Sequence, residues 1–138
     1  MTSDVNDMNA RIIEEFRGNA GNVGGPFEGR NMLLLHNIGA KSGAERINPL
    51  VYQALDRNFA IFASKGGAPT NPAWYYNLVA HPDITIEVGT ETLDVRARVA
   101  AAEERDQIWT RQKEEVPTFA DYEVATSRVI PVVVLERR

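Results

Sequence analysis

Residues 83–99, DITIEVGTETLDVRARV, alternate apolar and polar side chains on both sides of Gly89. The apolar positions on one face are Ile84, Ile86, Val88, Leu93, Val95, Ala97 and Val99. A period of two residues is that of a β-strand with one buried face, and a glycine between two such strands permits a tight turn. The segment therefore predicts an antiparallel hairpin, which restricts the chain to folds that are built around a β-sheet.

Four further stretches have the length and composition of strands. Residues 31–37 form a continuous apolar run, which predicts a strand that is buried on both faces. Residues 46–54 and 58–64 follow after short polar turns, which favours antiparallel pairing, and residues 129–136 supply a last strand. Pro49 has no amide hydrogen, so we expect it at an edge or a bulge of the sheet.

Three segments have the features of helices. In residues 4–17 the apolar side chains recur every three or four positions, which predicts an amphipathic helix. Asn71 precedes Pro72 as the expected cap of a helix that ends near residue 80. The charged residues 101–116 predict a surface helix.

We expect a single domain, because 138 residues are enough for one compact core. Residues 1–17 would be the N-terminal helix and residues 31–138 the body of the domain. The segment between them, residues 18–30, contains five glycines and is expected to be a flexible linker. The order of the elements predicts an α+β fold, with about six mainly antiparallel strands in a small curled sheet or barrel and with helices at its rim.

The composition excludes several classes of protein. The chain has no cysteine, which removes disulfides and thiolate chemistry, and its two histidines do not have the spacing of metal ligands, so no metal site is expected. The net charge of -4 argues against general affinity for nucleic acids. The N-terminus lacks the features of a secretory signal, and the apolar runs are far shorter than the roughly 20 residues of a membrane span. A cytoplasmic protein is expected.

Cations gather in one part of this acidic chain. Residues 30–66 carry five Lys or Arg against two acids, a charge of +3, whereas the remainder carries -7. Two glycine loops in or beside this segment, GAKSG at 39–43 and SKGG at 64–67, combine a lysine, a hydroxyl and backbone amides that glycine allows to converge. Each loop alone is also typical of a hairpin turn. Together with Arg46 they favour a site for a phosphorylated, polyanionic ligand.

An aromatic block follows the second loop. Trp74, Tyr75 and Tyr76 are consecutive on the expected helix, so they cannot all face the same way. Two of the rings are expected in the core, and one could form the wall of a site for a flat ring. Asn71 and Asn77 could cap the helix or bond a heterocycle.

The segments NMLLLHNIGAKSGAERINPLVY and FAIFASKGGAPTNPAWYYNLVAHPDITIEVG resemble the deazaflavin-dependent nitroreductase family. FRGNAGNVGGPFEGR before them and DYEVATSRVIPVVVLER after them extend the resemblance to nearly the whole chain. The resemblance implies a split β-barrel, related to that of the flavin-binding pyridoxamine-phosphate oxidases. It also implies coenzyme F420, an 8-hydroxy-5-deazaflavin, as the cofactor.

The resemblance further implies roles for particular residues. Those that would bind the coenzyme are Lys41, Ser42, Arg46, Asn48, Pro49, Leu50, Ala63, Ser64, Lys65, Gly66, Gly67, Ala73, Trp74 and Asn77. Lys41, Ser42 and Arg46 would hold the phosphate and the acidic tail, while the second loop would contact the tail and the ring. If the chain is an enzyme, we expect Ser64 and the backbone amides of Lys65 to Gly67 to stabilise developing negative charge and Tyr122 to donate a proton to the product.

The chain departs from its relatives at two places. Ala40 stands where relatives commonly have arginine, which would weaken binding of the tail or transfer it to Arg30 or Arg57. Nitroimidazole-reducing relatives carry three tyrosines near the substrate, and the matching residues here are Val116, Phe119 and Tyr122.

The implied activity is hydride transfer from the reduced coenzyme to a quinone, an activated alkene or a nitroaromatic compound. Two alternatives are an F420 carrier without turnover and an FMN-dependent oxidoreductase of the related barrel group. The chain could also bind a membrane surface through residues 4–17, and it could form a homodimer.

Overall fold

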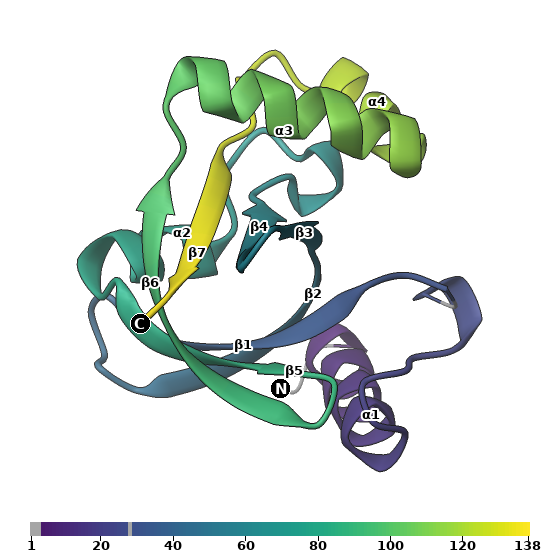
Figure 1. The fold of residues 1–138 in the computed structure, drawn as a ribbon, viewed down its shortest axis with the longest axis vertical. Helices are drawn as coiled ribbons and strands as arrows, with labels where there is room; N and C mark the ends of the chain where they lie inside the picture. Colours follow the sequence, from purple (N-terminus) through teal and green to yellow (C-terminus); the bar gives the residue numbers. More distant parts are fainter. Residues whose placement is uncertain (1–3, 28) are drawn as a thin grey trace.

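The computed structural model describes residues 4–27 and 29–138, which form four α-helices, two short 3-10 helices and seven β-strands (Figure 1). Residues 1–3 of the predicted helix and Glu28 of the predicted linker lie outside this described part. The elements are α1 (Asp4–Gly18), η1 (Gly25–Phe27), β1 (Met32–Ile38), β2 (Glu45–Val51), β3 (Gln53–Leu55), β4 (Asn58–Phe62), η2 (Lys65–Gly67), α2 (Ala73–Ala80), β5 (Asp83–Val88), β6 (Glu91–Val99), α3 (Ala102–Glu115), α4 (Thr118–Ala125) and β7 (Val132–Arg137). The predicted α+β class is confirmed.

The seven strands form one antiparallel sheet in the order β2-β1-β5-β6-β7-β4-β3. Its two edge strands, β2 and β3, are consecutive in the chain and only Tyr52 separates them. One residue cannot cross a flat sheet of seven strands that lie about 4.8 Å apart, so the sheet has to curl until its edges approach each other. Figure 1 shows the resulting curled half-barrel.

The strand pattern differs from the prediction at one point. The stretch 46–54, expected as one strand, divides at Tyr52 into β2 and β3, which gives seven strands instead of about six. Pro49 lies in the edge strand β2 opposite Leu34, as its missing amide hydrogen requires. The hairpin predicted for residues 83–99 is formed by β5 and β6, with Val88 paired to Glu91 across the turn.

The strand β1 is buried on both faces, as its apolar run predicts. Leu33 and Leu35 face the interior of the half-barrel, where they join residues of β4, β5, β6 and β7. The alternate residues Met32 and Leu34 lie on the outer face and pack with Ile12 and Phe16 of α1. The apolar face of this amphipathic helix therefore holds α1 against the sheet.

The strand β7, on the opposite side of the molecule, is likewise buried on both faces. Val133 and Leu135 face the interior, whereas Val132 and Val134 lie under α3 and α4 beside Trp109. Figure 1 shows these two helices above the curled sheet and α1 on the far side of β1. The helices thus cover the two outer surfaces that the sheet leaves apolar.

The glycine-rich segment before β1 lies against α1. The Gly21 amide donates to the Phe16 carbonyl at 2.8 Å, and the Gly24 amide donates to Glu15 Oε1 at 2.7 Å. Val23 is buried in the cluster beneath the helix. These contacts bring Phe27, at the end of η1, beside a groove that Ser64 and Trp74 also line.

Candidate functional site

A groove of about 540 Å³ lies between β2, the loop after β4, the start of α2, and α4; we call it the central groove. It is lined by Asn9, Phe27, Met32, Arg46, Asn48, Pro49, Leu50, Val51, Phe62, Ser64, Lys65, Pro72, Ala73, Trp74, Asn77, Phe119 and Tyr122. The predicted site residues that it brings together are Arg46, Asn48, Pro49, Leu50, Ser64, Lys65, Ala73, Trp74, Asn77 and Tyr122.

Local geometry explains why these residues share one groove. Arg46, Asn48 and Leu50 are spaced by two along β2, so their side chains leave the strand on the same face. Trp74 and Asn77 are three residues apart on α2, which places them on adjoining positions of one helical face. The curl of the sheet then sets the β2 face opposite α2 and α4.

The remaining predicted site residues do not line this groove. Lys41 and Ser42 are exposed in the turn between β1 and β2, where Ser42 Oγ accepts a hydrogen bond from the Ala44 amide at 3.2 Å. Ala63 is fully buried in the core of the half-barrel. Gly66 and Gly67 belong to η2, which packs against α4.

Gly67 has a specific structural reason to be glycine. Its φ is +83°, and a Cβ built on it would lie 2.8 Å from the Ala125 Cβ and 2.9 Å from the Tyr122 carbonyl oxygen. A side chain would therefore push α4 away from the loop. Through this close approach, Gly67 sets the position of the helix that carries Tyr122.

Three asparagines form a directed chain of hydrogen bonds beside the groove. Asn77 Oδ1 accepts from the Ala40 amide at 2.9 Å, and Asn77 Nδ2 donates to Asn37 Oδ1 at 2.7 Å. Asn37 Nδ2 in turn donates to Asn48 Oδ1 at 2.9 Å. Because the oxygen of Asn48 is occupied, its amide nitrogen is the group left to donate towards a ligand in the groove.

Asn37 was not foreseen as a site residue. It is completely buried on β1, and it connects the asparagine of α2 with the asparagine of β2. A polar residue at the end of the apolar run 32–35 was the signal that could have indicated it, because a buried amide needs partners of its own.

The first two residues of the SKGG loop, Ser64 and Lys65, line the groove. Ser64 is 8% exposed and has helical backbone angles, whereas Lys65 has a φ of +47°, in the left-handed region. The Gly67 amide donates to the Ser64 carbonyl at 2.9 Å and closes the turn. A lysine held in this strained conformation indicates that its backbone is fixed by other contacts.

Those contacts come from Arg128, which no motif in the sequence indicated. Its guanidinium bonds the loop, including Asn71 Oδ1 at 2.6 Å from Nη1. Asn71 is therefore not the side-chain cap of α2 that we expected; Pro72 stands at that position and makes no side-chain capping bond.

Aromatic and apolar side chains form one wall of the groove. The rings of Phe62 and Phe119 lie 5.3 Å apart, and those of Phe119 and Tyr122 lie 5.1 Å apart, in edge-to-face arrangements. Met32 and Phe27 extend this wall towards α1. The sequence had marked Phe119 only as the replacement of a tyrosine, and Phe27, Met32 and Phe62 were missed because nothing local distinguishes them from core residues.

The charges of the groove all have one sign. Arg46 and Lys65 contribute cations, and no carboxylate belongs to its lining within residues 4–27 and 29–138. Arg30 and Arg57, named above as substitutes for tail binding, do not line the groove. The arrangement favours an anionic ligand with a flat apolar body.

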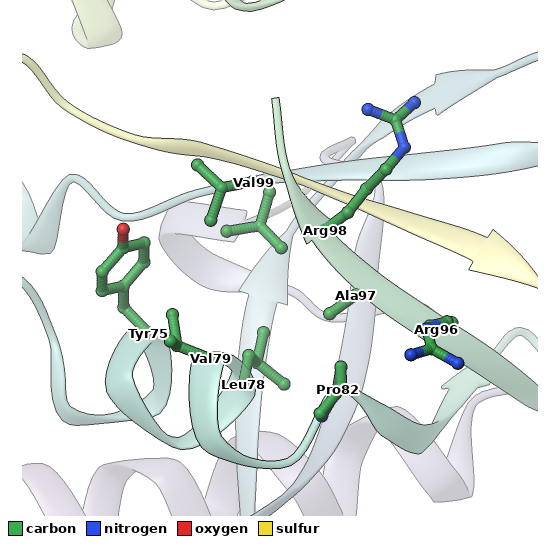
Figure 2. Close-up of a pocket in the computed structure, with 9 residues that line it drawn as sticks. Tyr75, Leu78, Val79, Pro82, Arg96, Ala97, Arg98 and Val99 are labelled. Carbon is green, nitrogen blue, oxygen red and sulfur yellow. The ribbon is translucent and has the colours of Figure 1, made fainter. Parts of the chain in front are cut away.

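A second, smaller cavity lies on the other side of α2. It has a volume of about 270 Å³ and is bounded by α2, Pro82 and β6 (Figure 2). Figure 2 shows the side chains of Leu78, Val79 and Ala97 turned towards it, while the arginines at 96 and 98 point away. Its lining is mainly apolar, although the two arginines also border it, and α2 separates it from the central groove.

Neither a metal centre nor a membrane span is found in the described part of the chain. No group of three or more His, Cys, Asp or Glu side chains there could hold a metal ion. None of the helices described is both long and apolar enough to cross a bilayer.

The curled half-barrel is the fold of the split-barrel reductases. A solved F420-H2 dependent reductase superposes with a TM-score of 0.71 at 39% sequence identity, covering 78% of this chain and 95% of that one. A solved domain-swapped dimer superposes with a TM-score of 0.72 at 35% identity, covering 96% of both chains.

The family follows from the sequence comparison. The model of the F420H(2)-dependent quinone reductase family matches residues 9–137. An F420H(2)-dependent quinone reductase of Mycobacterium tuberculosis is 39% identical over 127 residues, which cover 89% of this chain and 85% of that protein. The chain therefore belongs to the F420H(2)-dependent quinone reductase family. It is an oxidoreductase whose cofactor is coenzyme F420, as the resemblance implied.

Proposed function

We propose that this chain transfers hydride from reduced F420 to a quinone bound in the central groove. The observation that carries the proposal is the groove itself, because cations, amide donors and aromatic rings line it together and none of its described lining residues is a carboxylate. Among the acceptors considered, a quinone agrees with the family, whereas activated alkenes and nitroaromatic compounds have no comparable support.

The residues present fit this coenzyme. A deazaflavin is a flat ring system that bears a phosphate and an acidic tail, so its site needs an apolar slot, hydrogen-bond donors and cations. Leu50 and Trp74 supply apolar walls, Asn48 Nδ2 supplies a donor, and Arg46 and Lys65 supply the charge. The volume of about 540 Å³ lies within the range of small-molecule sites.

Within this proposal the residues divide into four groups. Arg46 and Lys65, with Lys41 and Ser42 in the turn before β2, hold the phosphate and the tail. Asn48, Pro49 and Leu50 line the path of the coenzyme, and Ala73, Trp74 and Asn77 complete the pocket. Ser64 and Lys65, which line the groove, contact the ring and the tail, while Ala63, Gly66 and Gly67 lie outside the lining and support this loop.

When bound, the reduced coenzyme supplies the hydride. The Ser64 hydroxyl and the nearby amides stabilise negative charge as it develops. Tyr122 donates a proton to the reduced acceptor from its place on α4. Phe62 and Phe119 hold the acceptor ring and exclude water from it.

Binding and turnover together test the proposal. Titration of the purified chain with F420 should quench tryptophan fluorescence, because Trp74 lines the groove. Under anaerobic conditions the protein should then oxidise reduced F420 only when a quinone is added. Ser64→Ala and Tyr122→Phe should each lower kcat by roughly 10- to 100-fold while the protein stays folded.

Other results of the same titration support the alternatives. Binding without acceptor-dependent oxidation would identify a carrier and contradict the proposed reaction. Displacement of F420 by an equal concentration of FMN would support an FMN-dependent enzyme. Failure to bind F420 at all would remove the basis of the proposal.

The homodimer is a further proposal, supported by the domain-swapped dimer among the similar structures. On the described surface, the apolar cavity beside α2 is the face best suited to a second copy. Val79 is 61% exposed and Val99 is 47% exposed at its rim, although both are apolar.

The peripheral membrane contact through residues 4–17 and the cytoplasmic location stay predictions. Ile12 and Phe16 are buried against the sheet, so the contact would have to use the remaining surface of α1, where Met8 is 48% exposed. Sedimentation with liposomes tests it, since Met8→Glu should release a chain that binds through this surface. Equal sedimentation of both chains, or none, would contradict the contact.

A further inference from the structure

Arg128 lies between α4 and β7, and its side chain ties down the loop that joins β4 to α2. Nε donates to the Ala68 carbonyl at 2.9 Å and Nη1 donates to Asn71 Oδ1 at 2.6 Å. Nη2 donates to the carbonyls of Ala63 and Ser64, each at 3.0 Å. All three nitrogens of the guanidinium are thus used on this one loop.

The choice of side chain matters here. A guanidinium presents its donors in a rigid planar fork, whereas the ammonium of lysine is a compact charge with a different geometry. No carboxylate forms an ion pair with Arg128 in the part of the chain that the structure describes. Its charge is directed to neutral oxygens of the backbone and of Asn71 instead.

These bonds decide which way the peptide groups of the loop point. In a trans peptide the C=O and the N–H point in opposite directions. The carbonyls of Ala63 and Ser64 face Arg128, so the amides of Ser64 and Lys65 point away from it. Neither amide has an acceptor among the described residues, and Ser64 and Lys65 both line the central groove.

We propose that Arg128 is a positioning residue of the reductase: it holds Ser64 and Lys65 so that their amides and the Ser64 hydroxyl face the coenzyme. Arg128 itself does not line the groove and acts through the loop. The inference rests on the proposed function, because the oriented groups matter to the reaction only if the groove binds F420.

A matched pair of variants tests the role, Arg128→Lys and Arg105→Lys. Arg105 also donates to a backbone carbonyl, that of Ile130 at 3.0 Å, and its guanidinium stacks on Trp109 at 5.1 Å, but it does not line the groove. Loss of a half-buried arginine is therefore common to both variants, whereas only Arg128→Lys loses contacts to the loop.

Three measurements are compared. In the coenzyme-free protein, hydrogen exchange in residues 63–71 should accelerate about tenfold in Arg128→Lys and stay unchanged in Arg105→Lys. The Kd for F420 should rise about tenfold and kcat should fall, while the KM for the quinone stays within about twofold. In Arg128→Ala, added guanidinium ion should restore part of the affinity for F420.

The outcomes separate the two proposals. Unchanged exchange and an unchanged Kd in Arg128→Lys would overturn the positioning role, and so would equal effects in Arg105→Lys. A wild-type protein that neither binds nor oxidises reduced F420 would overturn the proposed function. If the protein does not bind F420 but hydrogen exchange is still faster in Arg128→Lys, Arg128 only stabilises the loop, and its proposed role in the reaction is overturned.

Discussion

Asn77 shows how much of the groove depends on single polar atoms. It is 6% exposed and joins the turn after β1 to Asn37, which holds Asn48 in turn. A buried polar group that loses its partner costs about 1–3 kcal/mol, more than the net gain from making the bond. In such a pair one amide donates and the other accepts, so even an isosteric change that turns the donor into an acceptor destabilises the protein.

Asn77→Asp should lower the free energy of unfolding by about 2–4 kcal/mol, since an oxygen would replace the nitrogen that faces Asn37 Oδ1. Urea denaturation at pH 7 measures the loss. Asn71→Asp is the control, because the oxygen that accepts from Arg128 remains, and its stability should stay within about 0.5 kcal/mol of wild type. Equal losses in the two variants would contradict the explanation.

A comparison of Gly67 with Gly43 distinguishes the effect of backbone strain from the effect of a close contact. Both have positive φ, +83° and +70°, but a Cβ at Gly43 would meet no atom within 4 Å. Gly43→Ala should cost about 1 kcal/mol, and Gly67→Ala about 2–4 kcal/mol because α4 must move as well. Only Gly67→Ala should also lower kcat, through the displacement of Tyr122; an unchanged kcat would disprove the link.

At the scale of elements, α1 is attached by an apolar face and by one ionic contact. Arg17 makes two hydrogen bonds to Glu87 on β5, at 2.7 and 3.1 Å. His36 Nε2 lies 2.6 Å from the same carboxylate and its Nδ1 lies 3.4 Å from Glu45. The hydrogen bond from Arg17, aided by His36, holds the pKa of Glu87 below its ordinary value of 4.5.

The depressed pKa has a definite consequence for stability. A carboxylate whose pKa falls on folding stabilises the folded state above its unfolded pKa, and this contribution is lost as the pH falls through the folded pKa. Glu87→Gln should therefore cost about 1–2 kcal/mol at pH 7, and its difference from wild type should shrink below pH 4.5. Urea melts across this pH range, with Glu91→Gln on the same hairpin as the control, measure it; a constant difference would refute the assignment.

At the scale of the whole molecule, the closure of the sheet at Tyr52 creates the groove, and α2 closes one side of the half-barrel. The same helix leaves a mainly apolar cavity on its outer side (Figure 2). A face of this kind is expected to be covered by another protein surface.

Size-exclusion chromatography with light scattering tests the dimer. Val79→Glu should convert dimers to monomers, because a charge would be buried in the interface. Val124→Glu is the control, since Val124 is 88% exposed on α4 and lies outside the cavity. A wild-type monomer, or equal dissociation of both variants, would contradict the location of the interface.

Much of the fold could be predicted from local pattern. The period of two in residues 83–99, the doubly buried run at 31–37 and the edge position of Pro49 follow from side-chain periodicity and backbone chemistry. The cationic segment and the SKGG loop likewise pointed to an anion site. These features are local, so a single stretch of chain is enough to specify them.

Tertiary structure decided which residues meet. Arg46, Ser64, Trp74 and Tyr122 share the groove because a seven-stranded sheet curls until its consecutive edge strands approach each other, and no local pattern encodes that closure. Arg128 was missed for the same reason. Most of its partners are backbone carbonyls about 60 residues away, and a backbone oxygen has the same chemistry at every position of the sequence.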